Sequence, residues 1–251
     1  MNVLIVGYGR MGREVEKHLL ARNHSIAGIV DPFVDTAEKK LTAALLEKAD
    51  MAIEFSLPEK IMDNIRLYAE TGVPAVIGTT GWDNERQAAE KLIKNKNATL
   101  MWGSNFAIGA HMFFYLAEKA AELLNNIPGY DIWLHETHHN KKKDSPSGTA
   151  LTAAGKVLGA YSGKTEIMPD KLDRQIESHE LHVSSSRGGF VHGTHSVFLD
   201  SANDTIEITH RARNRCGLAL GAVLSAEWLI GKKGFFQIED YIKELFPGGR
   251  N

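Results

Sequence analysis

The sequence has little of what several classes of protein need. Among 251 residues there is one cysteine, Cys216, which excludes an intrachain disulfide and a cysteine-based metal cluster and suits a reducing cytoplasm. Lysine and arginine number 29 against 31 acidic residues, so a formal charge of −2 gives no electrostatic reason to expect nucleic acid or an anionic membrane as partner. The apolar runs are too short to span a bilayer, and the N-terminus lacks the regions of a signal peptide. With 43% hydrophobic residues, the chain can bury the core of one large domain or two smaller ones.

The first residues have the pattern of a dinucleotide-binding unit. Residues 2–6 form a short, apolar, β-branched run, typical of a strand buried on both faces of a parallel sheet. A turn of the form G-x-G-x-x-G and a helical pattern follow at once. In this order the first glycine makes the turn, the second lets the backbone approach a pyrophosphate, and the third packs helix on strand. The predicted cofactor contacts in this turn are Gly7, Tyr8, Gly9, Arg10, Met11 and Gly12.

An acidic residue stands where such a unit holds the ribose. A second apolar strand, residues 25–30, ends in Asp31, nineteen residues after Gly12. A carboxylate in this place can accept hydrogen bonds from the ribose hydroxyls of NAD and repels the 2′-phosphate of NADP. Asp31 is therefore a further predicted cofactor contact.

Strands and helices alternate up to residue 106, which indicates a parallel, doubly wound sheet of the Rossmann type. Helices are expected at 36–48, 59–71 and 83–95, and strands at 51–55, 75–77 and 99–102. Polar turns follow the last two strands, at the edge where such sheets bind ligands, although ordinary turn chemistry explains them equally well. The candidates for the nicotinamide half are Gly78, Thr79, Thr80, Gly103, Ser104, Asn105 and Phe106.

The pattern changes after residue 106, where an α+β domain with an open mixed sheet is expected. Its predicted elements are helices at 108–125 and 147–158 and strands at 130–136, 180–186, 196–199 and 205–210. Helices at 218–230 and 239–245 are assigned back to the first domain. We therefore predict a dinucleotide-binding domain of residues 1–106 and 215–251, with a substrate-binding and oligomerisation domain, residues 107–214, inserted in it. The open face of the second sheet needs cover, and a second subunit is the expected source.

Residues 135–149 concentrate histidines, lysines and a helix start, and one interpretation of them is a zinc site. His135, Glu136 and His139 match H-E-x-x-H, which requires a helix so that both histidines reach one metal. The preceding residues 132–134 are strand-like, and in a strand positions i and i+4 lie about 13 Å apart at ~3.3 Å per residue. No metal site is therefore predicted.

The other interpretation is a loop that binds an anion and donates a proton. Ser-Gly-Thr at 147–149 begins a helix whose first N–H groups can bind a carboxylate. His138, His139 and Lys142 come from the loop that leads into it. Lys142 or a protonated histidine could donate a proton to an atom that receives a hydride. A solvated basic loop is the plain alternative: it suits Lys141 and Lys143 better, and it stays open for the other three.

The stretch 136–150 resembles the signature E-x-H-H-x-x-K-x-D-x-P-S-G-T-A of the 4-hydroxy-tetrahydrodipicolinate reductase (dihydrodipicolinate reductase) family of lysine and diaminopimelate biosynthesis. The likeness extends along most of the chain, through residues 9–12, 76–81, 104–106, 187–189, 193–195 and 207–210. It implies an enzyme that transfers a hydride from NADH or NADPH to an unsaturated cyclic imine with two carboxylates, and a cytoplasmic homotetramer built on the second-domain sheet.

The resemblance also implies roles for particular residues. His138 is the catalytic acid/base and Lys142 the proton donor, and the substrate is bound by His139, Gly148 and Thr149. Many members of the family carry a basic residue after the ribose-binding acid. In this chain Pro32 stands there, which favours NADH, although Lys39 or Lys40 could compensate.

Three other functions stay open on the residues alone. One is another two-domain dehydrogenase that acts on an amino or imino acid. The second is a zinc hydrolase that uses His135, Glu136 and His139. The third is a sensor that binds NAD without catalysis.

Overall fold

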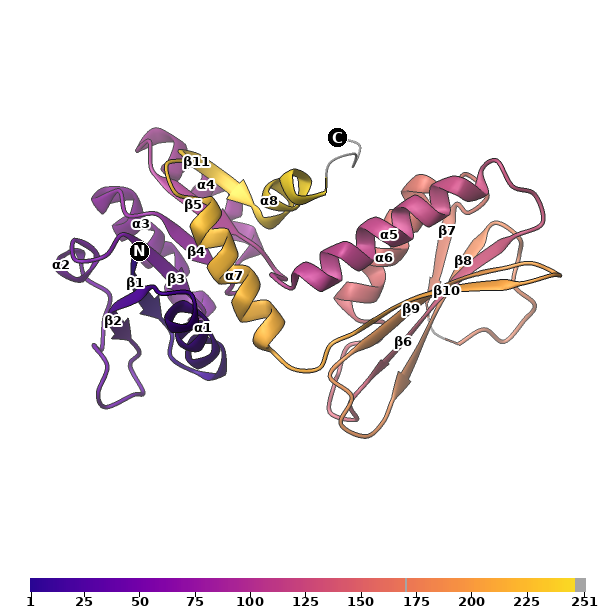
Figure 1. Cartoon of the computed structure of the whole chain (residues 1–251), viewed down its shortest axis with the longest axis horizontal. Helices are drawn as coiled ribbons and strands as arrows, with labels where there is room; N and C mark the ends of the chain where they lie inside the picture. The colour runs from indigo at the N-terminus through magenta and orange to yellow at the C-terminus, as the bar shows by residue number, and fades with distance from the viewer. Residues whose placement is uncertain (170, 247–251) are drawn as a thin grey trace. The chain divides into compact units, whose positions relative to one another are not determined.

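The chain forms two compact units, drawn in Figure 1 from a computed structural model that describes residues 1–169 and 171–246. Unit 1 comprises Met1–Ile108 together with the described residues from Arg215 onward. Unit 2, Gly109–Asn214, is inserted between these two parts. Within the described ranges, each helix is too short or too polar to cross a membrane.

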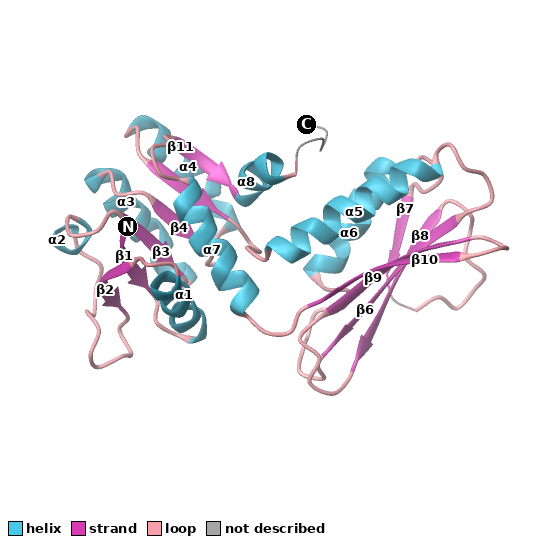
Figure 2. Cartoon of the chain, viewed as in Figure 1, coloured by secondary structure: helices cyan, strands magenta, loops and turns pink. Residues whose placement is uncertain are grey.

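Unit 1 is built on a parallel sheet with the strand order β11-β5-β4-β3-β1-β2 (Figure 2). The strands are β1 (Asn2–Val6), β2 (Ser25–Val30), β3 (Met51–Glu54), β4 (Ala75–Ile77), β5 (Thr99–Trp102) and β11 (Gly234–Gln237). The helices are α1 (Arg10–Ala21), α2 (Ala43–Leu46), α3 (Ile61–Thr71), α4 (Arg86–Asn95), α7 (Cys216–Trp228) and α8 (Ile238–Leu245), with 3₁₀ turns η1 (Pro58–Lys60) and η2 (Asp83–Glu85). Because each short apolar run predicted as a strand is present in one parallel sheet, the predicted Rossmann-type sheet is confirmed.

Alternate residues of these strands build two cores, one on each face of the sheet. On one face, strand residues such as Leu4 and Ile77 pack with α3 and α4 through Ile61, Ile65, Tyr68, Ala89 and Ile93. On the other face, Ile5 and Val76 pack with α1, α7 and α8 through Val15, Leu19, Ala219, Ala222, Val223, Ala226 and Ile238. Burial on both faces explains why the strands show no polar alternation in the sequence.

Unit 2 is an open mixed sheet covered on one face by helices, as predicted. Its strand order is β10-β9-β6-β8-β7, in which β10, β9 and β6 are antiparallel neighbours and β8 and β7 continue parallel to β6. The strands are β6 (Asp131–His138), β7 (Glu166–Pro169), β8 (Glu180–Arg187), β9 (Thr194–Asp200) and β10 (Thr205–Arg211), and the helices are α5 (Ile108–Leu124) and α6 (Gly148–Ala160).

Strand β6 alternates strictly between the two faces of this sheet. Its buried positions are Ile132, Leu134, Glu136 and His138, whereas Trp133, His135 and Thr137 are half-buried on the opposite face. The buried phase thus begins with apolar side chains and ends with two ionisable ones. On the open face the Trp133 ring stacks on Phe198 at 5.2 Å, and their neighbours on this face are polar.

Three sequence expectations about the elements were wrong. The helix expected at 36–48 is confined to Ala43–Leu46, because Glu38 instead pairs with Ile29 and Asp31 beside β2. Residues 234–237 and 166–169 form strands that were not predicted. His138 is the last residue of β6 rather than part of a loop.

Close approach of α7 to the end of β5 gives the first prediction. An added Cβ at Gly221 would lie 1.7 Å from the carbonyl oxygen of Phe106, whereas one at Gly217, in the same helix, meets nothing within 4 Å. We expect Gly221→Ala to lower the free energy of unfolding by about 3 kcal/mol, since the helix must move off the sheet. Gly217→Ala should be neutral or stabilising by up to about 1 kcal/mol. Urea unfolding measures both, and equal stabilities would contradict this packing.

Candidate functional site

The glycine turn of unit 1 is shaped to receive a ligand. Gly7 has φ 86°, and an added Cβ there would lie 2.2 Å from the carbonyl oxygen of Phe55. A Cβ at Gly12 would lie 2.2 Å from the Gly7 carbonyl oxygen, so α1 sits directly on the turn. Gly9, the N-cap of α1, has no side-chain cap and open space where a Cβ would point. The N–H groups at the start of α1 are therefore accessible to a phosphate.

The other residues of this turn divide between ligand side and core. Arg10 is exposed on the first turn of α1, whereas Met11 packs into the core beneath the helix. The Tyr8 hydroxyl donates to Glu16, and its backbone N–H donates to Asp31 Oδ2 at 2.7 Å. Arg10 therefore lies on the exposed side of the turn, while Tyr8 and Met11 contact other protein groups.

Asp31 is held in place at the end of β2. It is 8% exposed, and its second oxygen accepts from the Phe33 N–H at 2.8 Å. Two backbone donors fix the carboxylate, and each oxygen keeps a lone pair for a ribose hydroxyl. Lys39 donates to the Val34 carbonyl at 2.7 Å, which ties one of the two possible compensating cations into the loop.

The candidate nicotinamide loops follow β4 and β5 at the same edge of the sheet. Thr79 is buried, and its hydroxyl accepts from the Ser56 N–H at 2.9 Å, so it braces two turns rather than facing outward. Gly78 and Gly103 leave no room for a side chain against Phe55 and Ile238, respectively. Thr80 and Ser104 are exposed, Asn105 accepts from the Ala107 N–H at 2.9 Å, and Phe106 is 1% exposed. Of this set, Thr80, Ser104 and backbone groups are available to a ligand.

In unit 2, the predicted residues gather at the end of β6. His138 is 7% exposed, and its ring meets the His195 ring edge-on at 5.1 Å. A Cβ at Gly193 would lie 2.9 Å from His138 Nε2, so the glycine leaves that nitrogen uncovered by a side chain. The chain then turns: the His139 N–H donates to Val191, and the Lys142 N–H donates to the His139 carbonyl at 3.1 Å.

Lys142 is half-buried and paired. Its Nζ lies 2.8 Å and 2.9 Å from the two oxygens of Asp144. The neighbouring Lys141 and Lys143 are exposed, which agrees with their interpretation as solvated residues.

The predicted carboxylate seat is the start of α6. Ser147 is the N-cap, and its hydroxyl accepts from the Ala150 N–H at 3.2 Å. Gly148 is exposed with open space around it, and Thr149 is half-buried. The N–H groups of these two residues lack intrahelical acceptors, as in the first turn of any helix.

Glu136 connects these parts, a role that sequence reasoning missed. It is 0% exposed and accepts from the Ser147 N–H at 2.9 Å, from the Ser147 hydroxyl, and from Arg187 Nη2 at 2.8 Å. His138 Nδ1 lies 3.0 Å from Glu136 Oε2, out of line for a good hydrogen bond, so that contact is mainly electrostatic. The period-2 alternation of β6, which places Glu136 in the buried phase, was the available signal.

Burial and charge set the protonation of this cluster. Burial lowers the pKa of His138 to about 4; the Glu136 carboxylate opposes that shift, and His195, Lys142 and Arg187 add to it. Burial alone would raise the pKa of Glu136, but hydrogen bonds from His195, Ser147 and Arg187 outweigh burial and hold it well below its usual range. At neutral pH the cluster thus contains an ionised Glu136 and a neutral His138.

The donor set does not favour a metal. The strand predicted for H-E-x-x-H is confirmed, and His135 instead contacts Ser184 at 2.8 Å. Glu136, His138 and His195 do bring ligand atoms within 4.8 Å of one another. However, the oxygens of Glu136 are already hydrogen-bonded, and the guanidinium of Arg187 would repel a cation placed there.

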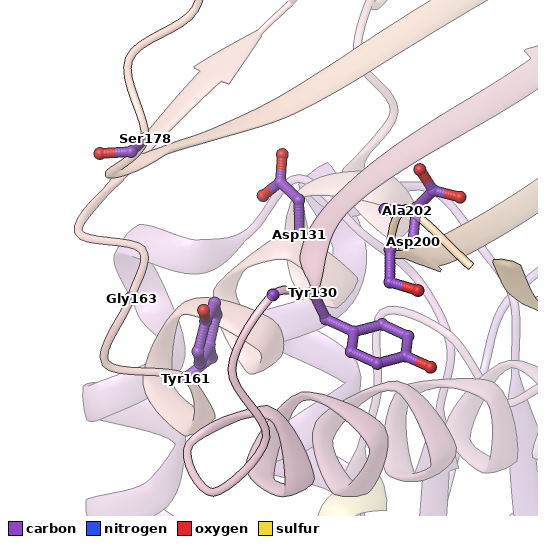
Figure 3. A pocket seen from close by; sticks show the side chains of 9 residues that line it. Tyr130, Asp131, Tyr161, Gly163, Ser178, Asp200 and Ala202 are labelled. Carbon is purple, nitrogen blue, oxygen red and sulfur yellow. The ribbon is translucent and has the colours of Figure 1, made fainter. Parts of the chain in front are cut away.

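A cavity of about 590 Å³ lies at the other end of β6 and includes none of these residues (Figure 3). Asp131, Asp200, Tyr130 and Tyr161 line it. Its carboxylates are occupied, Asp131 by Lys164 at 2.6 Å and Asp200 by the Thr205 hydroxyl. We assign no ligand to it.

A dinucleotide edge in one unit and a cluster of proton-transfer groups beside a helix start in the other define a two-domain NAD(P)-dependent oxidoreductase. Comparison with known proteins specifies it further. Residues 1–106 match the family model "Dihydrodipicolinate reductase, N-terminus", and residues 109–242 match "Dihydrodipicolinate reductase, C-terminus". The chain belongs to the dihydrodipicolinate reductase family.

Individual relatives agree over their whole length. The chain is 36% identical to a 4-hydroxy-tetrahydrodipicolinate reductase of Christiangramia forsetii, covering 98% of this chain and 99% of the relative. It is 35% identical to one of Natronomonas pharaonis, covering 96% and 100%. Among solved structures, a dipicolinate-bound dihydrodipicolinate reductase from Paenisporosarcina sp. TG-14 has the same fold, with TM-score 0.75 at 21% identity over 94% of this chain and 97% of that one.

The buried neutral histidine gives the second prediction. The unfolded chain protonates His138 near 6.5, whereas the folded chain does so only near 4, so the unfolded state binds more protons between these values and stability falls as the pH is lowered through this window. We expect the wild type to lose about 3 kcal/mol more than His138→Gln between pH 6.5 and 4.

Urea unfolding at a series of pH values measures this difference. His179→Gln removes an exposed histidine of the same unit and should keep the wild-type pH dependence. Parallel stability curves for wild type and His138→Gln would contradict a neutral, buried His138.

Proposed function

We propose that this protein reduces 4-hydroxy-tetrahydrodipicolinate (dihydrodipicolinate) to tetrahydrodipicolinate with NAD(P)H, in lysine and diaminopimelate biosynthesis. One observation carries the proposal: His138 and Lys142 are tied to the start of α6 in a chain that also has a dinucleotide edge. The full-length relatives with that name support it.

Unit 1 binds the cofactor, which supplies the hydride when bound. The open space at Gly9 and the start of α1 receive the pyrophosphate, and Asp31 accepts from the ribose hydroxyls. Since Asp31 is pinned by two backbone N–H groups, it cannot turn away from a 2′-phosphate. NADH is therefore the preferred form.

Unit 2 binds the substrate through its charge. The N–H groups of Gly148 and Thr149 hold one carboxylate at the positive end of the α6 dipole. His139 and Lys142, from the turn after β6, face the rest of the substrate. A substrate with two carboxylates has a cationic or N–H partner for each.

Lys142 is the proton donor to the substrate, and His138 assists as a neutral acid/base. A histidine whose pKa is about 4 carries no spare proton at neutral pH in the substrate-free protein. The ammonium of Lys142 does carry one, and Asp144 holds it in place at 2.8 Å. The approach of a dianionic substrate favours protonation of His138 and extends its part in the transfer.

We further propose that the protein is a cytoplasmic homotetramer, assembled through the open face of the unit 2 sheet. The stacked Trp133 and Phe198 rings give that face an apolar centre, and a content of one cysteine suits a reducing compartment. The mass of a monomer in sedimentation equilibrium would contradict the proposed tetramer. Recovery of the protein in a membrane or exported fraction would contradict the proposed location.

The third prediction tests the function directly. With freshly generated substrate, NADH should be oxidised with a higher kcat/KM than NADPH, by about tenfold, which corresponds to about 1.4 kcal/mol of repulsion at Asp31. Asp31→Asn, which removes the charge but keeps an acceptor, should reduce the difference in kcat/KM between NADH and NADPH.

Absence of turnover with either cofactor would reject the proposed reaction. A panel of other imino and amino acids then separates another dehydrogenase, which oxidises NADH with one of them, from a sensor, which binds NADH without turnover.

The fourth prediction concerns the proton donor. Lys142→Ala should lower kcat by about 10²–10⁴-fold, because transfer from a positioned acid is lost, while the Kd for NADH stays unchanged. Lys143→Ala, at an exposed position of the same turn, is the matched control and should keep kcat within about twofold. Stopped-flow turnover and NADH fluorescence titration measure both quantities, and a Lys142→Ala protein with wild-type kcat would remove Lys142 from the mechanism.

A further inference from the structure

Glu136 takes no part in the proposed chemistry, yet it is connected to the groups that do: to His138 directly, to the start of α6 through Ser147, and to Lys142 through Arg187 and Asp144. We propose that Glu136 is a positioning residue that fixes the acid/base histidine, the proton-donating lysine and the carboxylate seat in one geometry. The inference rests on the proposed function and adds a residue to it. It does not require Glu136 to touch the substrate.

Three connections run from this carboxylate. The first is to His138, two positions along β6 on the same buried face, with Nδ1 3.0 Å from Oε2. The negative charge favours the proton on Nδ1 and leaves Nε2, the nitrogen beside Gly193, without one. The second is to Ser147, whose backbone N–H donates to Glu136 at 2.9 Å and whose hydroxyl also caps α6. These bonds join the start of α6 to the end of β6.

The third connection reaches Lys142 through Arg187. One guanidinium nitrogen, Nη2, donates both to Glu136 at 2.8 Å and to the Asp144 backbone carbonyl at 2.6 Å. The Asp144 side chain in turn pairs with Lys142. Removing the carboxylate would release the guanidinium and with it the loop that carries the proton donor.

The cost of burial explains why Glu136 has several donors around it. A carboxylate that is 0% exposed is stable only when its oxygens accept hydrogen bonds. Glu136 also has partners in the sheet: it accepts from the Ser185 hydroxyl at 3.1 Å, and His195 Nε2 lies 3.4 Å from Oε2. These partners come from β8, β9 and α6. A shift of any one of them would leave a buried charge short of a donor.

A second buried carboxylate in the same sheet provides a control. Glu180, at the start of β8, is 4% exposed and binds Arg174, with Nη1 at 2.8 Å from Oε2. Arg187 ends the same strand, seven residues or about 23 Å away. Both carboxylates are buried and both hold a guanidinium, but only Glu136 adjoins the proposed site.

The test compares Glu136→Gln with Glu180→Gln in the full chain. Glutamine keeps the shape and loses the charge. For Glu136→Gln we expect kcat/KM to fall about 100-fold, because misplacement of reacting groups by about 1 Å has that effect, and the Kd for dipicolinate, a planar dicarboxylate probe, to rise about tenfold. The Kd for NADH should be unchanged. Glu180→Gln should lower the melting temperature about as much as Glu136→Gln does. It should leave kcat/KM, the Kd for dipicolinate and the Kd for NADH within about twofold of the wild-type values.

The dissociation constants separate positioning from stability. A protein that is merely less stable has fewer active molecules, so kcat falls while the Kd for dipicolinate does not change. Wild-type kcat/KM in Glu136→Gln, an unchanged Kd for dipicolinate, or an equal loss of activity in Glu180→Gln would each overturn the inference.

Two further arms keep the result decisive. If Glu136→Gln does not fold, Ser147→Ala removes one donor to the carboxylate; it should weaken dipicolinate binding, and unchanged binding would overturn the inference. If the wild type binds NADH and dipicolinate but reduces no fresh substrate, the proposed reaction fails while positioning of the seat is still judged by dipicolinate binding. If the wild type is active and Glu136→Gln equals it, only the inference fails.

Discussion

A carboxylate without access to water must be surrounded by donors, and in unit 2 this requirement organises the end of the sheet. Glu136 draws the cap of α6, the end of β8 and the neighbouring strand β9 onto the last residues of β6. Replacing such a group by an apolar one is often neutral or stabilising in other proteins, so stability alone is weak grounds for keeping it. Its value here is geometric, because it fixes a histidine and a helix start relative to one another.

The two units use different physical means to place their polar groups. In unit 1, parallel strands end at one edge, and the turns after them converge because the sheet is continuous. The Gly7 N–H donates to the Val30 carbonyl, so the glycine turn and the end of β2 are joined through the backbone. In unit 2, the site lies at the junction of a strand, a turn and a helix start, which only specific side-chain bonds can hold.

This difference explains how much could be predicted from the sequence. The glycine turn and Asp31 were placed by local patterns alone, since the strand, turn and helix are adjacent in the chain. The partners of Glu136 are distant: Ser185 is 49 residues away and Arg187 is 51. Pairing at such separation leaves no local pattern, so from the sequence Glu136 stands out only as part of the H-E-x-x-H match and of the family signature.

Errors in element assignment have similar causes. Residues 36–42 have helical composition, but Glu38 pairs with backbone groups at the edge of β2, and the neighbouring residues form turns and bends until Thr42 caps a single helical turn. The predicted strand ended at residue 136, which assigned His138 to the loop that leads into the next helix. The strand continues to it because position 138 shares the buried phase of Ile132 and Leu134, and an ionisable residue in that phase is tolerated when Glu136 lies beside it.

Burial of His138 also decides how the work of proton transfer divides. A histidine near its ordinary pKa would be partly protonated at neutral pH and could compete with Lys142 as donor. Burial lowers the pKa of His138, and the nearby cations lower it further. At neutral pH, His138 is therefore a weaker source of a proton than Lys142. The Lys142 ammonium is held in place by its ion pair with Asp144. In the proposed mechanism, Lys142 therefore makes the initial donation and His138 is left able to accept.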